Sequence, residues 1–179
     1  KIREEERKVL YDQYYGMEKE VVTGIVQRVM GKNVSINLGK ADAILAENEQ
    51  VRGEEFHPTE HIKVYILEVK DTPKGPRIQV SRTHPGLVKR LFESEVAEVR
   101  DGTVEIKSIA REAGSRTKIA VWSNDPDVDP VGACVGMNGA RVNSIVEELR
   151  GEKIDIINWD ENPAILIENA LSPAKVIAV

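Results

Sequence analysis

Apolar and polar positions alternate with a period of two along residues 18–82, a pattern typical of half-buried β-strands. The residues that share a face by this period are, in part, Thr23, Ile25 and Val29, then Val34, Ile36 and Leu38, and then Ile62, Val64 and Ile66. Two shorter apolar segments, 41–47 and 77–82, bring the set to five strands, and a polar loop over residues 47–60 interrupts it. Five strands with one long insertion predict an OB-type β-barrel. Such a barrel usually binds oligonucleotides, although a purely structural barrel fits the same pattern.

A helical period flanks these strands on both sides. Residues 1–15 have sparse apolar positions among charges, and Gly16 is expected to end this helix. After Pro85, apolar residues at 87, 88, 91, 96 and 99 predict one helix that extends to about Arg100. Strands at 103–110 and 117–123, helices at 130–135 and 140–150, and a strand at 153–159 follow. The second half of the chain therefore has the order α-β-β-α-α-β, and a helix over residues 162–171 and a strand over 174–179 are also expected.

The loop between the last two helices of that order reads Gly136-Met137-Asn138-Gly139. Asp129 and Pro130 are suited to the start of the helix before it. Glycines let a ligand approach the backbone, and the free N–H groups at a helix N-terminus favour an anion such as phosphate. The helix after the loop has one apolar face and Gly151 as its expected C-terminal cap; the face consists of Val142, Ile145, Val146 and Leu149.

A G-x-x-G sequence between two helices is typical of the KH loop, which clamps a single-stranded nucleic-acid backbone. The Walker and dinucleotide-binding spacings do not occur in the chain. The loop alone is explained equally well by a tight corner that needs glycine for packing. The surrounding α-β-β-α-α-β order, which is that of type II (prokaryotic) KH domains, favours the KH interpretation. The predicted fold class is thus α+β and multidomain, with the barrel followed by a KH domain.

Charge and composition limit the binding partners and the cellular compartment that we expect for the protein. The net charge of −5 argues mildly against a bulk nucleic-acid binder. Local basic clusters are nevertheless present; they are Lys74, Arg77, Arg82, Lys89 and Arg90, and Lys107, Arg111, Arg116 and Lys118. No stretch approaches the ~20 apolar residues of a membrane span. The single cysteine, Cys134, is expected to be a small core residue and fits a reducing, cytoplasmic compartment.

Two groups of residues have spacings that suggest metal binding. Asp125, Asp127 and Asp129 resemble the start of a calcium loop, but the glycine and late glutamate of that loop are missing. His57 and His61 have helical spacing, but Pro58 lies between them and a third ligand is not evident. We therefore expect no metal and no cofactor, and because a catalytic set is not evident either, we do not expect an enzyme.

Three stretches closely resemble the NusA family of bacterial transcription elongation, termination and antitermination factors. They are VTGIVQRVMGKNVSINLGKADAIL, IKVYILEVKDTPKGPRIQVSRTHPGLVKRLFESEVAEVRDGTVEIKSIAREAGSRTKIAV and DPVGACVGMNGARVNSIVEELRGEKIDIINW. The resemblance implies a connector helix over residues 1–17 from a missing N-terminal domain and an S-one OB-type barrel over 18–83. It also implies a first KH domain over 84–160 and the beginning of a second, truncated KH domain over 161–179.

The resemblance implies an RNA-binding part of a factor that works with RNA polymerase, mainly through the missing N-terminal domain, and with other elongation factors. It would bind nascent single-stranded RNA and modulate pausing, termination and antitermination. The RNA-binding residues carried over or placed nearby are Gly136, Met137, Asn138, Gly139, Arg141, Arg116, Lys118, Ile154, Ile156 and Trp159. Arg141, directly after the loop, is placed to meet a phosphate. The barrel lacks the aromatic residues that S-one domains often use to stack bases, so we expect it to bind RNA weakly.

Two other functions remain open from the sequence. An exosome-type RNA-binding cap subunit also places an S-one barrel before a KH domain, but the hairpin ahead of the G-x-x-G loop favours NusA. A protein-interaction scaffold, in which G-x-x-G is only a corner, belongs to a different class. RNA binding that depends on both salt and the loop distinguishes the scaffold from the two RNA-binding functions.

Overall fold

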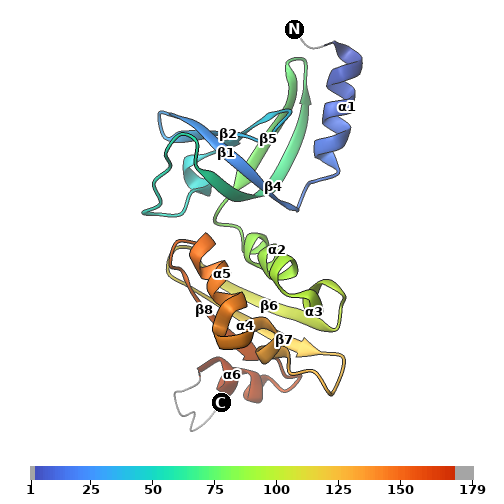
Figure 1. Ribbon diagram of the computed structural model, residues 1–179, viewed down its shortest axis with the longest axis vertical. Helices are drawn as coiled ribbons and strands as arrows, with labels where there is room; N and C mark the ends of the chain where they lie inside the picture. The colour runs from blue at the N-terminus through green and yellow to red at the C-terminus, as the bar shows by residue number, and fades with distance from the viewer. Residues whose placement is uncertain (1–2, 172–179) are drawn as a thin grey trace. The chain divides into compact units, whose positions relative to one another are not determined.

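The computed structural model describes residues 3–171 and divides into two compact units at Arg90 and Leu91 (Figure 1). The sequence-based boundary at residues 83 and 84 lies a few residues earlier, and the domain limits stay a prediction. The strand expected at 174–179 lies outside the described residues. Within the described part of the chain, no helix is long and apolar enough to cross a membrane.

The first helix, α1 (Glu4–Tyr15), packs against two strands of the barrel, β4 (His61–Thr72) and β5 (Gly75–Ser81). Tyr14 is buried among the barrel residues, and its hydroxyl donates to the Leu38 carbonyl and accepts from the Lys40 N–H, both at 3.1 Å. Gly16 ends the helix, as expected. The few apolar positions of this charged helix are therefore sufficient to fix it on the barrel.

Five strands close into a barrel in the order β1-β2-β3-β5-β4, which confirms the predicted OB-type topology (Figure 1). The strands not yet bounded are β1 (Val21–Met30), β2 (Asn33–Asn37) and β3 (Asp42–Leu45), and a short 3-10 helix, η1 (Glu47–Glu49), opens the long loop. All neighbouring strands are antiparallel except β3 and β5, which are parallel. The parallel pair arises because the long loop carries the chain across before β4 returns.

The predicted inward faces of β2 and β4 are confirmed, because Val34, Ile36, Ile62, Val64 and Ile66 are all buried. In β1 the inward residues are instead Gly24 and Val26, while Ile25 and Val29 are exposed. A register shift between Val26 and Arg28 disrupts the alternation. Gly24 gave no apolar signal, yet a side chain there would lie 2.3 Å from Ile36 Cγ2, so glycine is required for packing.

The second half of the chain has the predicted element order, with one correction. The single helix expected to reach Arg100 is two helices, α2 (Pro85–Glu95) and α3 (Ala97–Arg100). Val96 separates them with an extended backbone, at φ −113° and ψ 107°, and its side chain is fully buried. An unbroken helix would also bury Val96, so the apolar period alone could not reveal the break.

A three-stranded sheet in the order β6-β7-β8 forms the framework of this part of the chain. Strands β6 (Val104–Glu112) and β7 (Arg116–Ser123) form the predicted hairpin, and β8 (Lys153–Asn158) joins β7 in parallel. Helix α4 (Pro130–Val135), the turn η2 (Met137–Gly139) and helix α5 (Ala140–Glu148) connect β7 to β8, and α6 (Pro163–Leu171) follows β8. Helices α4 and α5 pack on the sheet and hold the G-x-x-G loop between them (Figure 1).

Candidate nucleic-acid interface

The loop begins at Gly136, where the backbone turns sharply out of α4. Asp129 caps the start of α4 by accepting from the Val131 N–H, as predicted, and Cys134 on this helix is buried, also as predicted. Gly136 has φ 79° and ψ 174°, a conformation that is essentially restricted to glycine. A Cβ atom at Gly136 would lie 2.7 Å from Arg141 Cγ and 3.0 Å from the Arg141 backbone nitrogen. The first glycine is therefore required both by its backbone angles and by the close approach of Arg141.

The centre of the loop is a single 3-10 turn. The Gly139 N–H donates to the Gly136 carbonyl at 3.2 Å, and the Ala140 N–H donates to the Met137 carbonyl. Asn138 (φ 54°, ψ 28°) and Gly139 (φ 75°, ψ 14°) are both left-handed. Met137 is 85% exposed, and within the described chain no side chain caps the N-terminus of α5 at Gly139. The loop thus presents an open helix N-terminus, which suits an anionic ligand.

Arg141, in the first turn of α5, is engaged within the protein. Its Nη1 atom donates to Glu98 Oε2 on α3 at 2.7 Å and to the Ala133 carbonyl on α4 at 2.8 Å. The pKa of Glu98 is lowered, first by a hydrogen bond from its own backbone and then by Arg141. The contact between Arg141 and a phosphate that the sequence suggested therefore stays a prediction, and in this structure the guanidinium binds protein groups.

Two apolar residues of the predicted RNA-binding set, Ile154 and Ile156, lie on the same face of β8. Ile154 and Ile156 pair with Thr117 and Ile119 of β7, and both isoleucines are partly buried. Since side chains alternate along a strand, the two isoleucines share the face of the sheet on which Thr117 and Ile119 are buried. They provide an apolar edge next to α5, which also packs on β8.

Trp159 follows directly after β8, and its backbone N–H donates to the Val121 carbonyl at 2.8 Å. Its ring meets Trp122 in a T-shaped arrangement with the centroids 5.8 Å apart. Lys107 Nζ lies 5.2 Å from the centroid of the Trp159 ring. Trp159 therefore belongs to an aromatic and cationic group at the end of the sheet.

Arg116 and Lys118 lie on the opposite face of the sheet from Ile154 and Ile156. Arg116 Nε is 3.1 Å from Asp155 Oδ2, and Lys118 Nζ donates to the carbonyl of Ala170 on α6. This follows from the register, because Lys118 pairs with Asp155 while Thr117 pairs with Ile154. The structure therefore does not gather all of the predicted RNA-binding residues on one surface.

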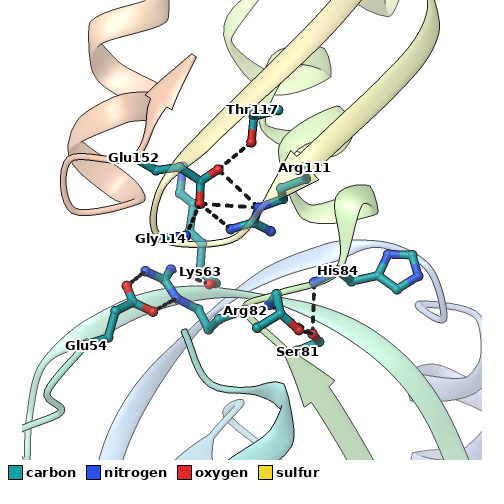
Figure 2. Close-up of polar contacts among 10 residues, drawn as sticks. Glu54, Lys63, Ser81, Arg82, His84, Arg111, Gly114, Thr117 and Glu152 are labelled. Carbon is teal, nitrogen blue, oxygen red and sulfur yellow. Dashed lines mark hydrogen bonds and ion pairs between the residues drawn. The ribbon is translucent and has the colours of Figure 1, made fainter. Parts of the chain in front are cut away.

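Two arginines that the sequence placed in basic clusters are buried in ion pairs. Arg82 binds Glu54, with Nη2 at 2.6 Å from Oε2, and donates to the Lys63 carbonyl at 2.8 Å. Arg111 binds Glu152, with Nη2 at 3.0 Å from Oε1, and both side chains are fully buried (Figure 2). Neither arginine is available to a nucleic acid, so the clusters are smaller than the sequence suggested. Nothing local in the sequence identifies Glu54, Glu98 and Glu152 as partners of arginines, because each partner is distant in sequence.

The residues with metal-like spacing lie in a turn, at a helix cap, in a loop and at the start of a strand. Asp125 Oδ1 accepts from the Asp127 N–H at 2.9 Å, and Asp129 caps α4. His57 lies in a loop and His61 begins β4, so their spacing does not place them on one helix. Among residues 3–171, no group of three or more potential metal ligands comes together.

Comparison with known proteins identifies relatives over the entire chain. A family model described as the NusA-like first KH domain matches residues 82–159. The chain is 57% identical over 179 residues to the transcription termination/antitermination protein NusA of Bacillus subtilis, and it covers 48% of that protein. The NusA proteins of Thermus thermophilus and Rickettsia conorii are 46% and 40% identical over 98% and 97% of this chain, which covers 46% and 34% of them. The chain thus spans less than half the length of each of these relatives.

Proposed function

Because the chain belongs to the NusA family, we propose that it is the RNA-binding part of a bacterial transcription factor. In this proposal it binds nascent single-stranded RNA and acts with RNA polymerase to modulate pausing, termination and antitermination. RNA polymerase and other elongation factors are its protein partners, and its compartment is the cytoplasm. The names of the relatives and the match to the first KH domain support this role.

The geometry of the Gly136–Gly139 loop is the single observation that carries the proposal. Both glycines have positive φ, and Met137 and Asn138 lie between them at the N-terminus of α5. A phosphate can approach this backbone closely, and the positive end of the helix dipole stabilises it by roughly 0.3–1 kcal/mol. A KH loop of this kind clamps about four nucleotides.

The apolar edge of β8 supplies the second half of the proposed RNA site. Ile154 and Ile156 are partly buried and offer apolar surface to bases, while the loop holds the sugar–phosphate chain. The barrel contributes less, because β2 and β3, which read NVSIN and DAIL, have no aromatic side chain. Stacking on an aromatic ring is worth about 1–3 kcal/mol per base, and these two strands cannot provide it.

The experiment that tests the proposal adds negative charge to the loop without changing its shape. The test variant is Met137→Asp/Asn138→Asp, and the matched control is Met137→Asn, which has asparagine at both positions. Asparagine and aspartate are similar in size and both tolerate the left-handed backbone of residue 138. The two variants therefore differ only by two carboxylates.

Binding of a short single-stranded RNA is measured at two salt concentrations for wild type, test and control, after circular dichroism confirms folding. Two charges about 5 Å from phosphates cost about 1 kcal/mol each in water, so the test variant should bind more than tenfold more weakly. The control should bind as wild type does. Equal binding by all three proteins would show that the loop is not part of the RNA-binding site. Absence of binding by wild type would favour the scaffold function, in which the loop is only a corner.

A further inference from the structure

Arg141 joins the two helices that flank the loop to a third helix. Its Nη1 atom binds the Ala133 carbonyl at 2.8 Å, in the last turn of α4, and Glu98 Oε2 at 2.7 Å. Glu98 lies on α3, 43 residues earlier in the chain, and is remote in sequence from the loop. Carbonyls in the last turn of a helix have no partner within the helix, so Arg141 satisfies a group that would otherwise need water.

The stem of Arg141 also fits against the start of the loop. Its Cγ and Cβ atoms lie 2.7 Å and 3.0 Å from the position that a Cβ atom would occupy on Gly136. The side chain therefore extends from the helix after the loop, passes Gly136 and reaches the helix before the loop. Its position fixes both ends of the Gly136–Gly139 loop at once.

Glu98 provides the charge that keeps Arg141 in this position. A cation in the first turn of a helix opposes the helix dipole, so the guanidinium needs an anion nearby. Glu98 is that anion, and both side chains are 34% exposed, which leaves the pair at the surface rather than in the core. Neutralising Glu98 should therefore release the guanidinium without unfolding the protein.

We propose that Glu98 is a positioning residue for the RNA-binding loop: it holds Arg141 across the two ends of the loop and so keeps the loop backbone ready for phosphate. This inference rests on the proposed function. It assigns Arg141 a structural task in place of the direct phosphate contact that the sequence suggested. The two roles of Arg141 predict opposite effects when Glu98 loses its charge.

The test variant is Glu98→Gln, and the matched control is Glu147→Gln, which removes the same charge from an exposed position on α5. Affinity for a short single-stranded RNA is measured over a series of salt concentrations, and amide hydrogen exchange of the loop is measured by NMR. We expect Glu98→Gln to bind roughly three- to tenfold more weakly with an unchanged salt slope, and Gly136 and Gly139 to exchange faster. The control should match wild type, and Glu98→Gln should have no further effect in an Arg141→Gln background.

Tighter binding by Glu98→Gln, with a salt slope steeper by about 0.7, would show that a released Arg141 binds phosphate and would overturn the inference. Unchanged affinity and unchanged loop exchange would overturn it as well. A wild-type protein that binds no RNA would instead refute the proposed function itself. The two failures are therefore distinguished by whether wild type binds.

Discussion

Replacing Glu152 by glutamine should destabilise the second unit of the chain more than a surface substitution can. Glu152 Oε1 accepts from the Gly114 N–H at 2.7 Å, Oε2 accepts from Thr117 Oγ1 at 2.6 Å, and the Arg111 guanidinium binds both oxygens (Figure 2). The carboxylate thus ties the residue before β8 to the β6–β7 turn and to β7. It sets the position of the strand that carries the apolar edge of the proposed site.

The magnitude follows from what the substitution leaves behind. The Arg111 charge would stay fully buried and lose its counterion, and one amide NH₂ group would face donors instead of accepting from them. Removing one partner of a buried ion pair typically costs about 3–5 kcal/mol. A unit of this size is stable by only about 4–13 kcal/mol, so much of its stability would be lost.

The cost of this substitution should depend on pH in a defined direction. Burial opposes ionisation of Glu152, but hydrogen bonds from Arg111, Thr117 and Gly114 outweigh it, and the pKa of the carboxyl is lowered. A folded-state pKa below the unfolded value of about 4.3 means that the stabilisation is complete above that value and is lost as pH falls through the folded pKa. The gap between wild type and Glu152→Gln should therefore be largest at neutral pH and shrink in acid below about pH 4.

Urea unfolding followed by tryptophan fluorescence is the appropriate assay, because the protein has two tryptophans and both Trp122 and Trp159 lie in the second unit. The control is Glu112→Gln, an exposed acid next to Arg111 in sequence, which should change stability by less than about 0.5 kcal/mol. A cost below about 1 kcal/mol for Glu152→Gln, or a gap that persists unchanged in acid, would refute the reasoning.

The remaining predictions concern the loop and the buried thiol. Gly136→Ala should lower the free energy of unfolding by about 1–3 kcal/mol, because glycine alone adopts these backbone angles. Gly139→Ala should lower it by less, since its Cβ would meet only the side chain of Asn143, at 3.3 Å. Urea unfolding of both variants checks this order, and equal losses would contradict it. Burial raises the pKa of Cys134 to about 11, so its thiol should react with a disulfide reagent at pH 8 only as fast as the protein opens; rapid reaction of the folded protein would show that the thiol is exposed.

Local patterns were sufficient for most of the fold. The alternation in β2 and β4 identified the inward residues, since a strand with one buried face must have period two. The same rule failed in β1, where a register shift follows Val26 and the inward position next to it is Gly24, which has no side chain to signal its burial. The break at Val96 was also invisible, because neither glycine nor proline marks it and because Val96 fits the apolar period of a single helix.

The burial of two charged residues could not be predicted from the sequence. Arg82 and Arg111 belong to basic clusters of the sequence, and such residues are expected at the surface because charged side chains are rarely buried unless they are paired. Their partners lie 28 and 41 residues away, at Glu54 and Glu152, and no local pattern connects them. Only the fold brings the pairs together, and a count of basic residues along the chain therefore overstates the charge that a nucleic acid could meet.

The proposed site also has one part that the sequence reveals and another part that it does not. The loop could be recognised from its glycines, because backbone angles such as those of Gly136 exclude other residues and so leave a mark in the sequence. The role proposed for Arg141 could not be recognised in the same way. A basic residue beside such a loop is equally consistent with a direct contact to phosphate and with a contact that holds the loop in place. Its partner Glu98 lies beyond the β6–β7 hairpin, on the short helix α3 whose existence the sequence did not reveal. The backbone part of such a site is thus encoded locally, whereas the arrangement of its charges depends on long-range contacts, and that is why the decisive variants change charge at constant shape.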